Sequence, residues 1–548
     1  MNTIVRKKVF LTNPPLNMAE TPLQYHRPMV PLGLGYLGGA LEDHFTDGKW
    51  SEYFFDRVSK KTSQRYSPSG LVAAQDNMLL SFYGKYDHGH LLSRMKAFTK
   101  DCSEEEFYIG ISILSDGVRA AREMLKSFRF HFPLAKIIVG GPHSTFFPYD
   151  FYLNINEKNG SLVDYVVRNE GEQTIIGIVE GLLSTESDLK INGERYGINV
   201  LGSDYSDDEY RIIDGGQFKG DSDRLKLHVL DELSIPAYFL FEEDGKLPYE
   251  PDKRYGLTAP AVNINSSRGC PHKCTFCTIP KLALGYRSHS PQRMVEMVIF
   301  LLQEYQIKSL FFREDNFMYS GGTLTGDRWG DIESFCHILV EQKIKVNWAI
   351  EARADNIMQK TTTGEVRLDL LKRSGLSGVY MGIESGVEIM LKLYGKGSNL
   401  EAMSKAISAC HERGVAVVAT TIFSDPDINF KRNFPLIEEP PSHYEVELRK
   451  QREEILDATR KFMDQLNIPE ELREEYCLVG IPVSAVYNLL KRNMDKYPRL
   501  VEHYDPVTRY IYPKGFDWWS HKVYQSAKRV RPYYGFDFTF PMDVSPKN

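Results

Sequence analysis

One short segment, Ser267 to Cys277, limits what this chain can be more than any other part of the sequence. It contains three of the seven cysteines, Cys270, Cys274 and Cys277, in the spacing C-x3-C-x2-C. Three thiolates on so short a loop can converge on one metal centre and still leave a coordination position free. Because thiolates are soft ligands, the segment predicts either zinc or an iron-sulfur cluster.

Zinc is the simpler of these two interpretations. A structural zinc site needs four protein ligands, and a catalytic one is usually completed by His or a carboxylate. His272 is a candidate for the fourth ligand, but it lies within the loop and would have to fold back onto an ion held by its own neighbours. The residues of the loop by themselves therefore leave both metals open.

The length and net charge of the chain limit which domains and binding partners can be expected around this loop. A chain of 548 residues is long enough for about two to four domains. Its net charge of -6 gives no general electrostatic signal for nucleic acid or for an anionic membrane. Apolar runs such as Met294 to Leu302 are too short to span a bilayer, and residues 1–10 lack a secretory signal. The odd cysteine count favours a reducing compartment, and we expect the cytoplasm.

The first third of the chain alternates strands and helices. A short apolar strand, Val9 to Thr12, runs into Asn13-Pro14-Pro15, where two prolines prevent a helix. Two later strands end in Gly140-Gly141-Pro142-His143 and in Glu170-Gly171-Glu172. Such repeats predict a parallel sheet with ligand-binding loops along one edge. The expected strands are 9–12, 108–112, 136–139 and 163–167, and the expected helices are about 117–129 and 172–183.

A glycine-rich segment, Pro31 to Leu41, lies between the first two of these strands and includes Gly33. Its small residues would let a helix approach a sheet or a flat ligand closely, and helix packing explains the pattern as well as ligand binding does. Residues 186–260 are irregular and polar, which predicts a β-rich insertion and linker.

From Ala261 onward the pattern is that of a β/α barrel. Strands are expected at 261–266, 309–313, 346–350, 378–382 and 415–422, separated by amphipathic helices such as 291–304 and 399–413. The cysteine loop follows the first strand, at the end where barrel active sites collect. Polar residues follow the next three strands, so they should gather at the same rim. They are Glu314 and Asp315, then Arg353, then Glu384 and Ser385.

The pattern is less regular after the fifth strand. A charge-dense helix is expected at about 443–466, and only Tyr476 to Pro482 offers a sixth strand. We therefore expect a partial six-stranded barrel with an insertion at about 426–475. The tail beyond residue 485 is thick with aromatic residues such as Trp518 and Trp519. It could close the barrel mouth over an organic substrate or form a small core of its own, and we slightly favour the core.

The cysteine loop, with Phe276 before its third cysteine, resembles that of the radical SAM family. The resemblance implies that Cys270, Cys274 and Cys277 hold a four-iron four-sulfur cluster whose fourth iron is chelated by S-adenosylmethionine. With this resemblance we favour the cluster over zinc. It also implies that the cofactor is contacted by rim residues, namely Phe276, Glu314, Asp315, Arg353, Glu384 and Ser385.

Roughly the first 185 residues resemble the cobalamin-binding domain that precedes the barrel in one class of these enzymes. The Asp-x-His-x-x-Gly motif that supplies an axial histidine elsewhere is missing, because Asp87-His88-Gly89-His90 has another spacing. The resemblance thus implies base-off cobalamin without an axial His. The alternative is a Rossmann-like scaffold without a ligand. The expected cobalamin contacts are Asn13, Pro14, Pro15, Gly33, Gly140, Gly141, Pro142, His143, Glu170, Gly171 and Glu172.

These inferences define an α/β chain of four parts. They are an N-terminal Rossmann-like cobalamin-binding domain at 1–185, the insertion at 186–260, a partial (β/α)6 TIM-type radical SAM barrel at 261–484 and a C-terminal α/aromatic-rich cap at 485–548. The cofactors would supply the hard chemistry, and the protein orientation and exclusion of water.

The expected function is a cobalamin-dependent radical SAM methyltransferase that acts on an unactivated carbon, or a phosphinate phosphorus, of a specialised metabolite. Its partners would be a small-molecule or carrier-bound substrate and an electron donor such as flavodoxin or ferredoxin. The first alternative is a non-methylating cyclase, oxidase or rearrangement enzyme with the same cofactors. The second alternative is a non-catalytic metal and corrinoid sensor.

Overall fold

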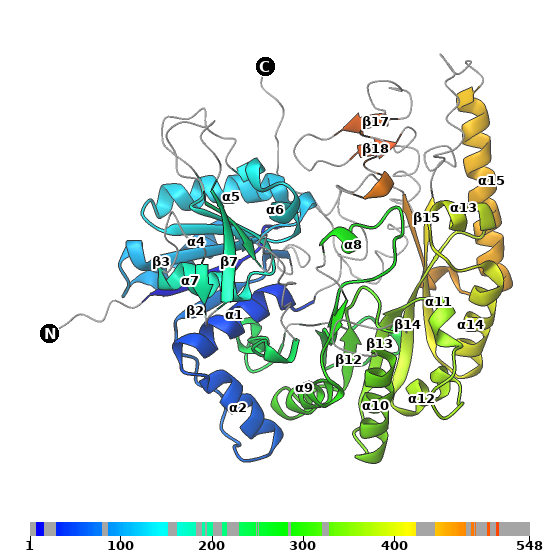
Figure 1. The fold of residues 1–548 in the computed structure, drawn as a ribbon, viewed down its shortest axis with the longest axis horizontal. Coiled ribbons are helices and arrows are strands. Elements are labelled where there is room, and N and C mark those ends of the chain that lie inside the picture. Colours follow the sequence, from blue (N-terminus) through cyan, green and yellow to red (C-terminus); the bar gives the residue numbers. More distant parts are fainter. Residues whose placement is uncertain are drawn as a thin grey trace.

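The structure is a computed structural model. It describes residues 7–15, 29–78, 86–151, 162–181, 189–191, 194–200, 211–215, 230–247, 249, 251–282, 286–319, 328–423, 444–477, 484–486, 488, 491, 501–504 and 511–513. Two α/β units stand side by side in Figure 1, one built from the first half of the sequence and one from the second. The predicted α/β class with parallel sheets is therefore confirmed. Within the described residues, no helix is both long and apolar enough to cross a membrane.

The first sheet has eight strands in the order β2-β1-β3-β4-β5-β8-β7-β6. The first six strands in this order run parallel to one another. β7 pairs antiparallel with β8, and β6 pairs antiparallel with β7. The strands are β1 (Lys8–Thr12), β2 (Val72–Gln75), β3 (Phe107–Ser112), β4 (Lys136–Gly140), β5 (Tyr165–Asn169), β6 (Leu189–Ile191), β7 (Glu194–Val200) and β8 (Arg211–Gly215). The last three lie in the segment for which the sequence predicts a β-rich insertion, and they extend this sheet.

Helices cover both faces of this sheet because successive side chains of a strand point to opposite faces. In β1, Val9 and Leu11 pack into one hydrophobic core, and Phe10 packs into the other. The first core also holds side chains of α1 (Leu32–Phe45), α2 (Lys49–Val58) and α7 (Glu172–Glu180). The second holds those of α4 (His88–Thr99) and α5 (Val118–His131).

Strand β5 begins two residues later than the sequence predicts. The reason is Asp164, whose carboxylate accepts hydrogen bonds from the backbone N–H of Ile137 at 2.8 Å and from Arg129 at 2.8 Å. This side chain takes the place of a ladder partner, so the parallel pairing with β4 begins at Tyr165.

The second sheet is a partial barrel of six parallel strands in the order β9-β12-β13-β14-β15-β16. Helices such as α9 (Pro291–Glu304), α10 (Arg328–Glu341) and α14 (Leu400–Glu412) lie on its outer side in Figure 1. The strands are β9 (Ala261–Ile264), β12 (Ser309–Phe312), β13 (Asn347–Ala352), β14 (Leu376–Glu384), β15 (Ala416–Phe423) and β16 (Arg473–Cys477).

The sixth strand starts three residues before the predicted one. β16 has the sequence Arg-Glu-Glu-Tyr-Cys, which carries no apolar run that would indicate a strand. It is polar because Glu474 points to buried hydrogen-bond partners in the barrel. The charged helix α15 (Tyr444–Gln465) precedes it and agrees with the expected range of about 443–466. The predicted aromatic tail core lies outside the described residues, apart from the backbone of β17 (Val501–Tyr504) and β18 (Ile511–Pro513).

Side chains that point into the barrel close its lower end. Phe311, Ala349 and Val418 come from three neighbouring strands and form one small core with Tyr255 and Leu257. Tyr255 stacks on Phe311 with ring centroids 5.2 Å apart. Opposite this apolar core, the strands finish at the end of the barrel that carries the polar rim.

The glycines of α1 are used for close packing against residues 235–241. A Cβ on Gly39 would lie 2.1 Å from the backbone oxygen of Ile235, and one on Gly38 would lie 2.3 Å from a methyl of Leu240. Gly33, by contrast, is exposed and has no described atom within 4 Å of such a position. The helix therefore approaches protein at Gly38 and Gly39, and only Gly33 stays available to a ligand.

We expect Gly39→Ala to lower the free energy of unfolding by about 1–3 kcal/mol, because the added methyl meets backbone that cannot rotate away. The matched variant is Gly33→Ala in the same helix, which should be neutral or stabilising by at most about 1 kcal/mol. Urea denaturation of the two cofactor-free variants makes the comparison. Equal unfolding midpoints for both would show that α1 does not approach residues 235–241 in this way.

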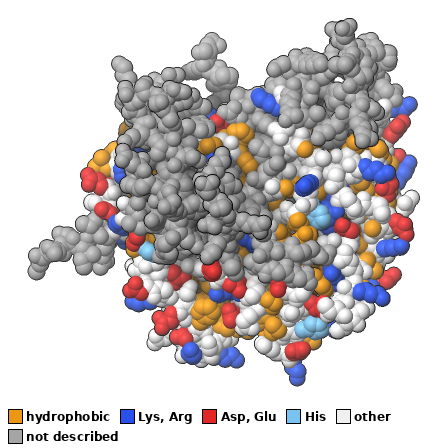
Figure 2. All heavy atoms as spheres, viewed as in Figure 1, with side chains coloured by type: hydrophobic (Ala, Val, Ile, Leu, Met, Phe, Trp, Pro, Cys, Tyr) orange, Lys and Arg blue, Asp and Glu red, His pale blue; other side chains and the backbone are white. Residues whose placement is uncertain are grey.

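The surface carries mixed charge. In the face drawn in Figure 2, Lys and Arg side chains alternate with Asp and Glu over the part that is described. This agrees with the net charge of -6, which predicts no general binding of nucleic acid.

Candidate functional site at the cysteine loop

The cysteine loop follows β9 and a short hairpin. Strand β10 (Ser267–Arg268) pairs antiparallel with β11 (Arg287–Ser288), and the loop lies between them. Gly269 has a φ of 91°, a left-handed conformation that favours glycine at the turn into the loop. Cys270, Cys274 and Cys277 are free thiols and half-buried. The predicted position of the loop, at the carboxyl end of the first barrel strand, is thus observed.

Burial dominates the electrostatics of the three thiols. It raises the pKa of Cys270 to about 11 and that of Cys277 to about 12, and it also raises the pKa of Cys274. Metal ligation would therefore have to displace protons from all three. Among the described side chains, no three Cys, His, Asp or Glu lie close enough to share one metal ion.

A second segment, just after α13 (Glu388–Leu393), holds the loop in place. The backbone N–H of Thr275 donates to the Tyr394 carbonyl at 2.9 Å, and the Thr275 hydroxyl donates to the Leu393 carbonyl at 3.2 Å. Phe276 packs edge-on against the Tyr394 ring, with centroids 5.7 Å apart. The loop is thus fixed by residues about 120 positions further along the chain, and Phe276 contributes to that packing.

Glu314, at the end of β12, supports the strand that leads into the loop. It is buried and accepts hydrogen bonds from the Ser266 backbone N–H at 2.5 Å and from the hydroxyls of Ser266 and Ser267. Its neighbour Asp315 is exposed, and nearby protein groups desolvate its carboxylate. This desolvation raises the pKa of Asp315 to about 6, against a hydrogen bond from the Gly269 backbone.

Arg353, Glu384 and a residue that the sequence analysis missed, Lys396, form one buried group. The Lys396 ammonium lies 2.6 Å from the Glu384 carboxylate, and Arg353 donates to the Lys396 carbonyl. Arg353 also pairs with Asp355 at 3.1 Å. The group reaches the loop, because Lys396 and Arg353 lower the pKa of Cys274 against the larger effect of burial. Lys396 lies between Gly395 and Gly397, which both have positive φ. In the sequence, these two flanking glycines were the only sign that Lys396 occupies a special position.

Glu384 owes its position to an irregular end of β14. The pairing with β15 shifts between Gly382 and Glu384, and Glu384 has a φ of 64°. A Cβ at Gly382 would lie 2.3 Å from the Glu384 carboxylate and 2.7 Å from the Lys396 ammonium. A larger residue at position 382 would therefore have to displace the ends of these two side chains. Ser385, the next residue, is buried, and its hydroxyl lies 3.4 Å from that of Thr459 in α15.

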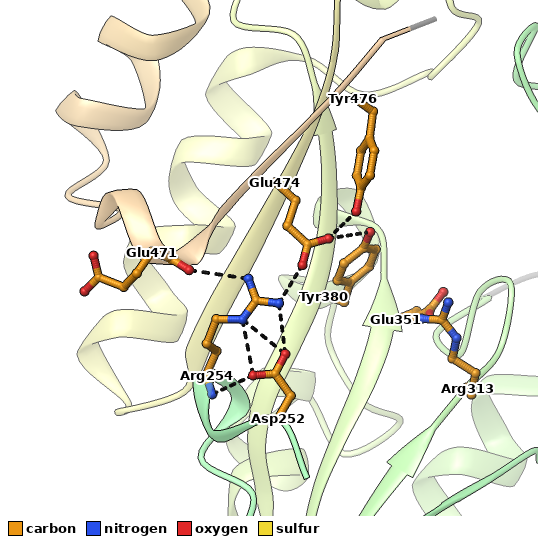
Figure 3. Close-up of polar contacts among 8 residues, drawn as sticks. All are labelled: Asp252, Arg254, Arg313, Glu351, Tyr380, Glu471, Glu474 and Tyr476. Atoms are coloured by element: carbon orange, nitrogen blue, oxygen red, sulfur yellow. Dashed lines mark hydrogen bonds and ion pairs between the residues drawn. The ribbon is translucent and has the colours of Figure 1, made fainter. Parts of the chain in front are cut away.

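A second polar layer lies one step deeper in the barrel. Figure 3 shows Glu474 between Arg254, at 2.6 Å, and the hydroxyls of Tyr380 and Tyr476. Asp252 holds the Arg254 guanidinium at 2.9 Å. Burial raises the pKa of Tyr380 well above its ordinary value, so its phenol stays a donor. Glu474 is in register with Thr420, and Thr420 with Gly382, so this layer supports the strand end that carries Glu384.

The expected cobalamin contacts of the first sheet fall into two groups. Asn13 is buried and accepts a hydrogen bond from the Asn77 backbone at 2.7 Å, which joins the loops after β1 and β2. Pro14 and Pro15 extend that turn. Gly141 has a φ of 93°, and a Cβ there would lie 2.7 Å from the Ile113 nitrogen, so the turn after β4 needs glycine. Gly140 and Pro142 flank it in the same turn.

The side chain of His143 lies inside the protein, and its contact with cobalamin stays a prediction. It is fully buried at the start of α6 (Pro142–Phe146), with its ring nitrogens 2.9 Å from the Ser115 hydroxyl and 3.3 Å from Asp150. A histidine in a glycine turn resembles a ligand-binding residue in sequence. Here it instead joins three elements of the scaffold.

Glu170 and Glu172, beside Gly171 at the end of β5, also have protein partners. Glu170 pairs with Arg287 and, at 3.3 Å, with Arg268, and Glu172 pairs with Arg268 at 2.7 Å. Both arginines belong to the β10–β11 hairpin that carries the cysteine loop. The carboxyl end of the first sheet therefore meets the carboxyl end of the barrel at the cysteine loop.

Residues 264–432 match the model of the radical SAM superfamily. The chain carries a radical SAM domain. The predicted radical SAM domain is thereby confirmed. The match begins within β9 and includes the cysteine loop and the strand ends that bear Glu314, Arg353 and Glu384.

Three curated proteins are similar to this chain. An uncharacterised methyltransferase of Pyrococcus horikoshii is 29% identical over 294 residues, and an anaerobic magnesium-protoporphyrin IX monomethyl ester cyclase of Rubrivivax gelatinosus is 23% identical over 336 residues. The matches cover 53% and 60% of this chain, and 54% of each relative. The chain thus spans about half the length of these two. A cytidylyl-2-hydroxyethylphosphonate methyltransferase of Streptomyces wedmorensis is 27% identical over 438 residues, 77% of this chain and 73% of that protein.

The fold is also that of a solved structure, the cobalamin-dependent S-adenosylmethionine radical enzyme OxsB with aqua-cobalamin and S-adenosylmethionine bound. The TM-score is 0.57 at 16% identity, over 97% of this chain and 67% of that chain.

Proposed function

We propose that this chain is a cobalamin-dependent radical SAM methyltransferase acting on an unactivated carbon, or on a phosphinate phosphorus, of a specialised metabolite. The observation that carries the proposal is the contact of Glu170 and Glu172 with the hairpin of the cysteine loop. Because sheets and barrels of this kind bind ligands at the carboxyl ends of their strands, a corrinoid on the first sheet would share one space with the loop. Radical chemistry alone does not require that arrangement. Two relatives named methyltransferases support it.

The residues fit a four-iron four-sulfur cluster, S-adenosylmethionine and cobalamin in chemical type. Cys270, Cys274 and Cys277 are three free thiols on one loop, as a cluster needs. Asp315 is an exposed carboxylate beside the loop and suits the cofactor's ammonium, and the Arg353, Glu384 and Lys396 group offers charges of both signs. When bound, the cluster supplies reductive cleavage of S-adenosylmethionine and the corrinoid carries a methyl group. The protein contributes position and exclusion of water.

For the corrinoid we propose the base-off form without a protein histidine. The spacing of Asp87 to His90 does not match an axial-histidine motif, and His88 is occupied by Tyr86 and Ser127 at 2.9 and 2.7 Å. Gly33 and the turns that contain Pro14, Pro15, Gly140, Gly141 and Pro142 are the proposed contacts. Six described cysteines are free thiols, which suits a reducing, cytoplasmic setting and an electron donor of the flavodoxin or ferredoxin type.

The deciding experiment uses a trideuteromethyl S-adenosylmethionine with anaerobically purified protein and candidate substrates. We expect the product to gain the labelled methyl group, with 5′-deoxyadenosine and S-adenosylhomocysteine accumulating in similar amounts. The bound cob(II)alamin should show no nitrogen superhyperfine splitting in its electron paramagnetic resonance spectrum. Such splitting from an axial ligand would contradict the base-off proposal.

A cyclase is the second candidate, because one relative carries that name at 23% identity. Substrate turnover with 5′-deoxyadenosine, but without labelled methyl or S-adenosylhomocysteine, would reject methyl transfer and favour the cyclase or another non-methylating reaction. Protein that retains no corrinoid would favour a first domain that serves only as scaffold.

A further inference from the structure

Two arginines and two glutamates join the first sheet to the hairpin of the cysteine loop. Arg287 donates both terminal nitrogens to Glu170, one of them at 3.2 Å, and its side chain is only 1% exposed. Arg268 bridges Glu170 at 3.3 Å and Glu172 at 2.7 Å. We call these four residues the arginine clamp.

An aromatic and a histidine extend the clamp on the side of α1. The Arg268 guanidinium lies over the Tyr36 ring, 4.8 Å from its centroid. The Tyr36 hydroxyl is 3.4 Å from His289, which follows β11, and His289 lies 2.8 Å from Asp231. The hairpin is therefore held by α1, by the turn after β5 and by the segment that links the two sheets. All of these contacts join residues at least 58 positions apart.

Burying charged side chains contributes little to the free energy of unfolding, even when the charges are paired. A buried ion pair roughly offsets its own desolvation, and well-packed apolar side chains would hold two sheets together as well. A guanidinium that bonds a carboxylate through two nitrogens does something that apolar packing does not, because it fixes both distance and direction. The clamp is therefore better explained by geometry than by stability.

The positions of the four clamp residues in the chain indicate which distance the clamp fixes. Arg268 is two residues before Cys270, and Arg287 begins the second strand of the same hairpin, ten residues after Cys277. Glu170 and Glu172 follow β5, the neighbour of the strand β4 that ends in the turn with Gly140 and Gly141. A rigid connection between the hairpin and the segment after β5 therefore sets the distance between the cysteine loop and the turns at the carboxyl end of the first sheet.

We propose that Arg268 and Arg287 are positioning residues that hold the corrinoid at a fixed distance from the cluster. This rests on the proposed function. Glu170 and Glu172, which the sequence suggests as cobalamin contacts, serve instead as the receiving half of this clamp. Because reacting groups lose roughly two orders of magnitude in rate when displaced by about 1 Å, a loosened clamp should uncouple cofactor cleavage from methyl transfer.

The test is a charge exchange between Arg287 and Glu170. Arg287→Glu places two carboxylates together, and Glu170→Arg places a third guanidinium beside those of Arg268 and Arg287. The double variant restores the pair between positions 287 and 170 in reverse order, while Arg268 keeps Glu172 as its partner. Arg287 is used because Arg268 is too near the cluster ligands. The matched control is the same exchange between Arg413 and Asp369, a pair at 2.6 Å on the outside of the barrel.

In each single variant we expect cluster iron and bound corrinoid to be kept. The ratio of labelled product to 5′-deoxyadenosine should fall at least about tenfold, and the magnetic interaction between cob(II)alamin and the reduced cluster should change. The double variant should regain both properties, and the control exchange should alter neither. Single variants with full cofactors, an unchanged ratio and an unchanged interaction would overturn the proposal. Corrinoid loss that the double variant does not restore would make Glu170 a corrinoid contact and would also overturn it.

Hydrogen exchange on cofactor-free protein separates this proposal from the proposed function. Exchange at residues 286–290 and 169–176 should rise together in each single variant and return in the double variant. If the wild type binds no corrinoid but hydrogen exchange changes in this way, the proposed methyltransferase function is rejected. The arginine clamp is then supported as a restraint between the two sheets. Unchanged hydrogen exchange in the single variants would show that the arginine clamp does not restrain the two sheets.

Discussion

Replacing any one of Cys270, Cys274 and Cys277 with Ala is expected to abolish the cluster and all formation of 5′-deoxyadenosine. The three half-buried thiols lie on one loop that is anchored at both ends, so no other described cysteine can take the missing position. Anaerobic reconstitution of the wild type should give about four irons per chain. Iron and sulfide analysis, together with deoxyadenosine assays, measures both losses.

The control for these variants is Cys102→Ala, which changes a half-buried free thiol in the first unit. It should reconstitute and cleave S-adenosylmethionine as the wild type does. A wild-type protein that takes up zinc and gives no cluster signal would refute the cluster. Full cleavage activity in any one of the three loop variants would show that this cysteine is not a ligand.

Glu384→Ala is expected to be the most damaging single change outside the cysteines. It leaves the Lys396 ammonium, whose side chain is 8% exposed, without its carboxylate partner at 2.6 Å. Removing one member of a buried pair typically lowers the free energy of unfolding by about 3–5 kcal/mol. Because Lys396 also accepts a hydrogen bond from Arg353 through its carbonyl, the loss should spread to the whole group beside Cys274.

A double variant separates stability from cofactor binding. Glu384→Gln with Lys396→Met removes both charges, so it should regain most of the lost stability in urea denaturation. If Glu384 contacts S-adenosylmethionine as we propose, this variant should fold and still fail to form 5′-deoxyadenosine. A double variant that is stable and fully active would restrict Glu384 and Lys396 to a structural role.

Local patterns explain why much of the fold was predictable. The strand at 309–313 and the helix at about 443–466 agree with β12 and α15, because alternation and helical period depend only on neighbours in sequence. β16 was missed at its start because its interior residue is a charged Glu474, which makes no apolar pattern. β5 begins later than predicted because the Asp164 side chain accepts the hydrogen bond of the Ile137 N–H, while the Asp164 N–H donates to the Ile137 carbonyl.

The sequence by itself determined the cysteine loop, since three cysteines within eight residues are a local property. It also determined the order of the strands that carry the rim. Only the tertiary structure decided what the polar residues contact. His143 turns inward, Lys396 joins Glu384, and Glu170 meets Arg287, 117 positions away. The physical reason is that a buried charge takes whichever opposite charge the fold brings within reach, and spacing along the chain does not specify that neighbour.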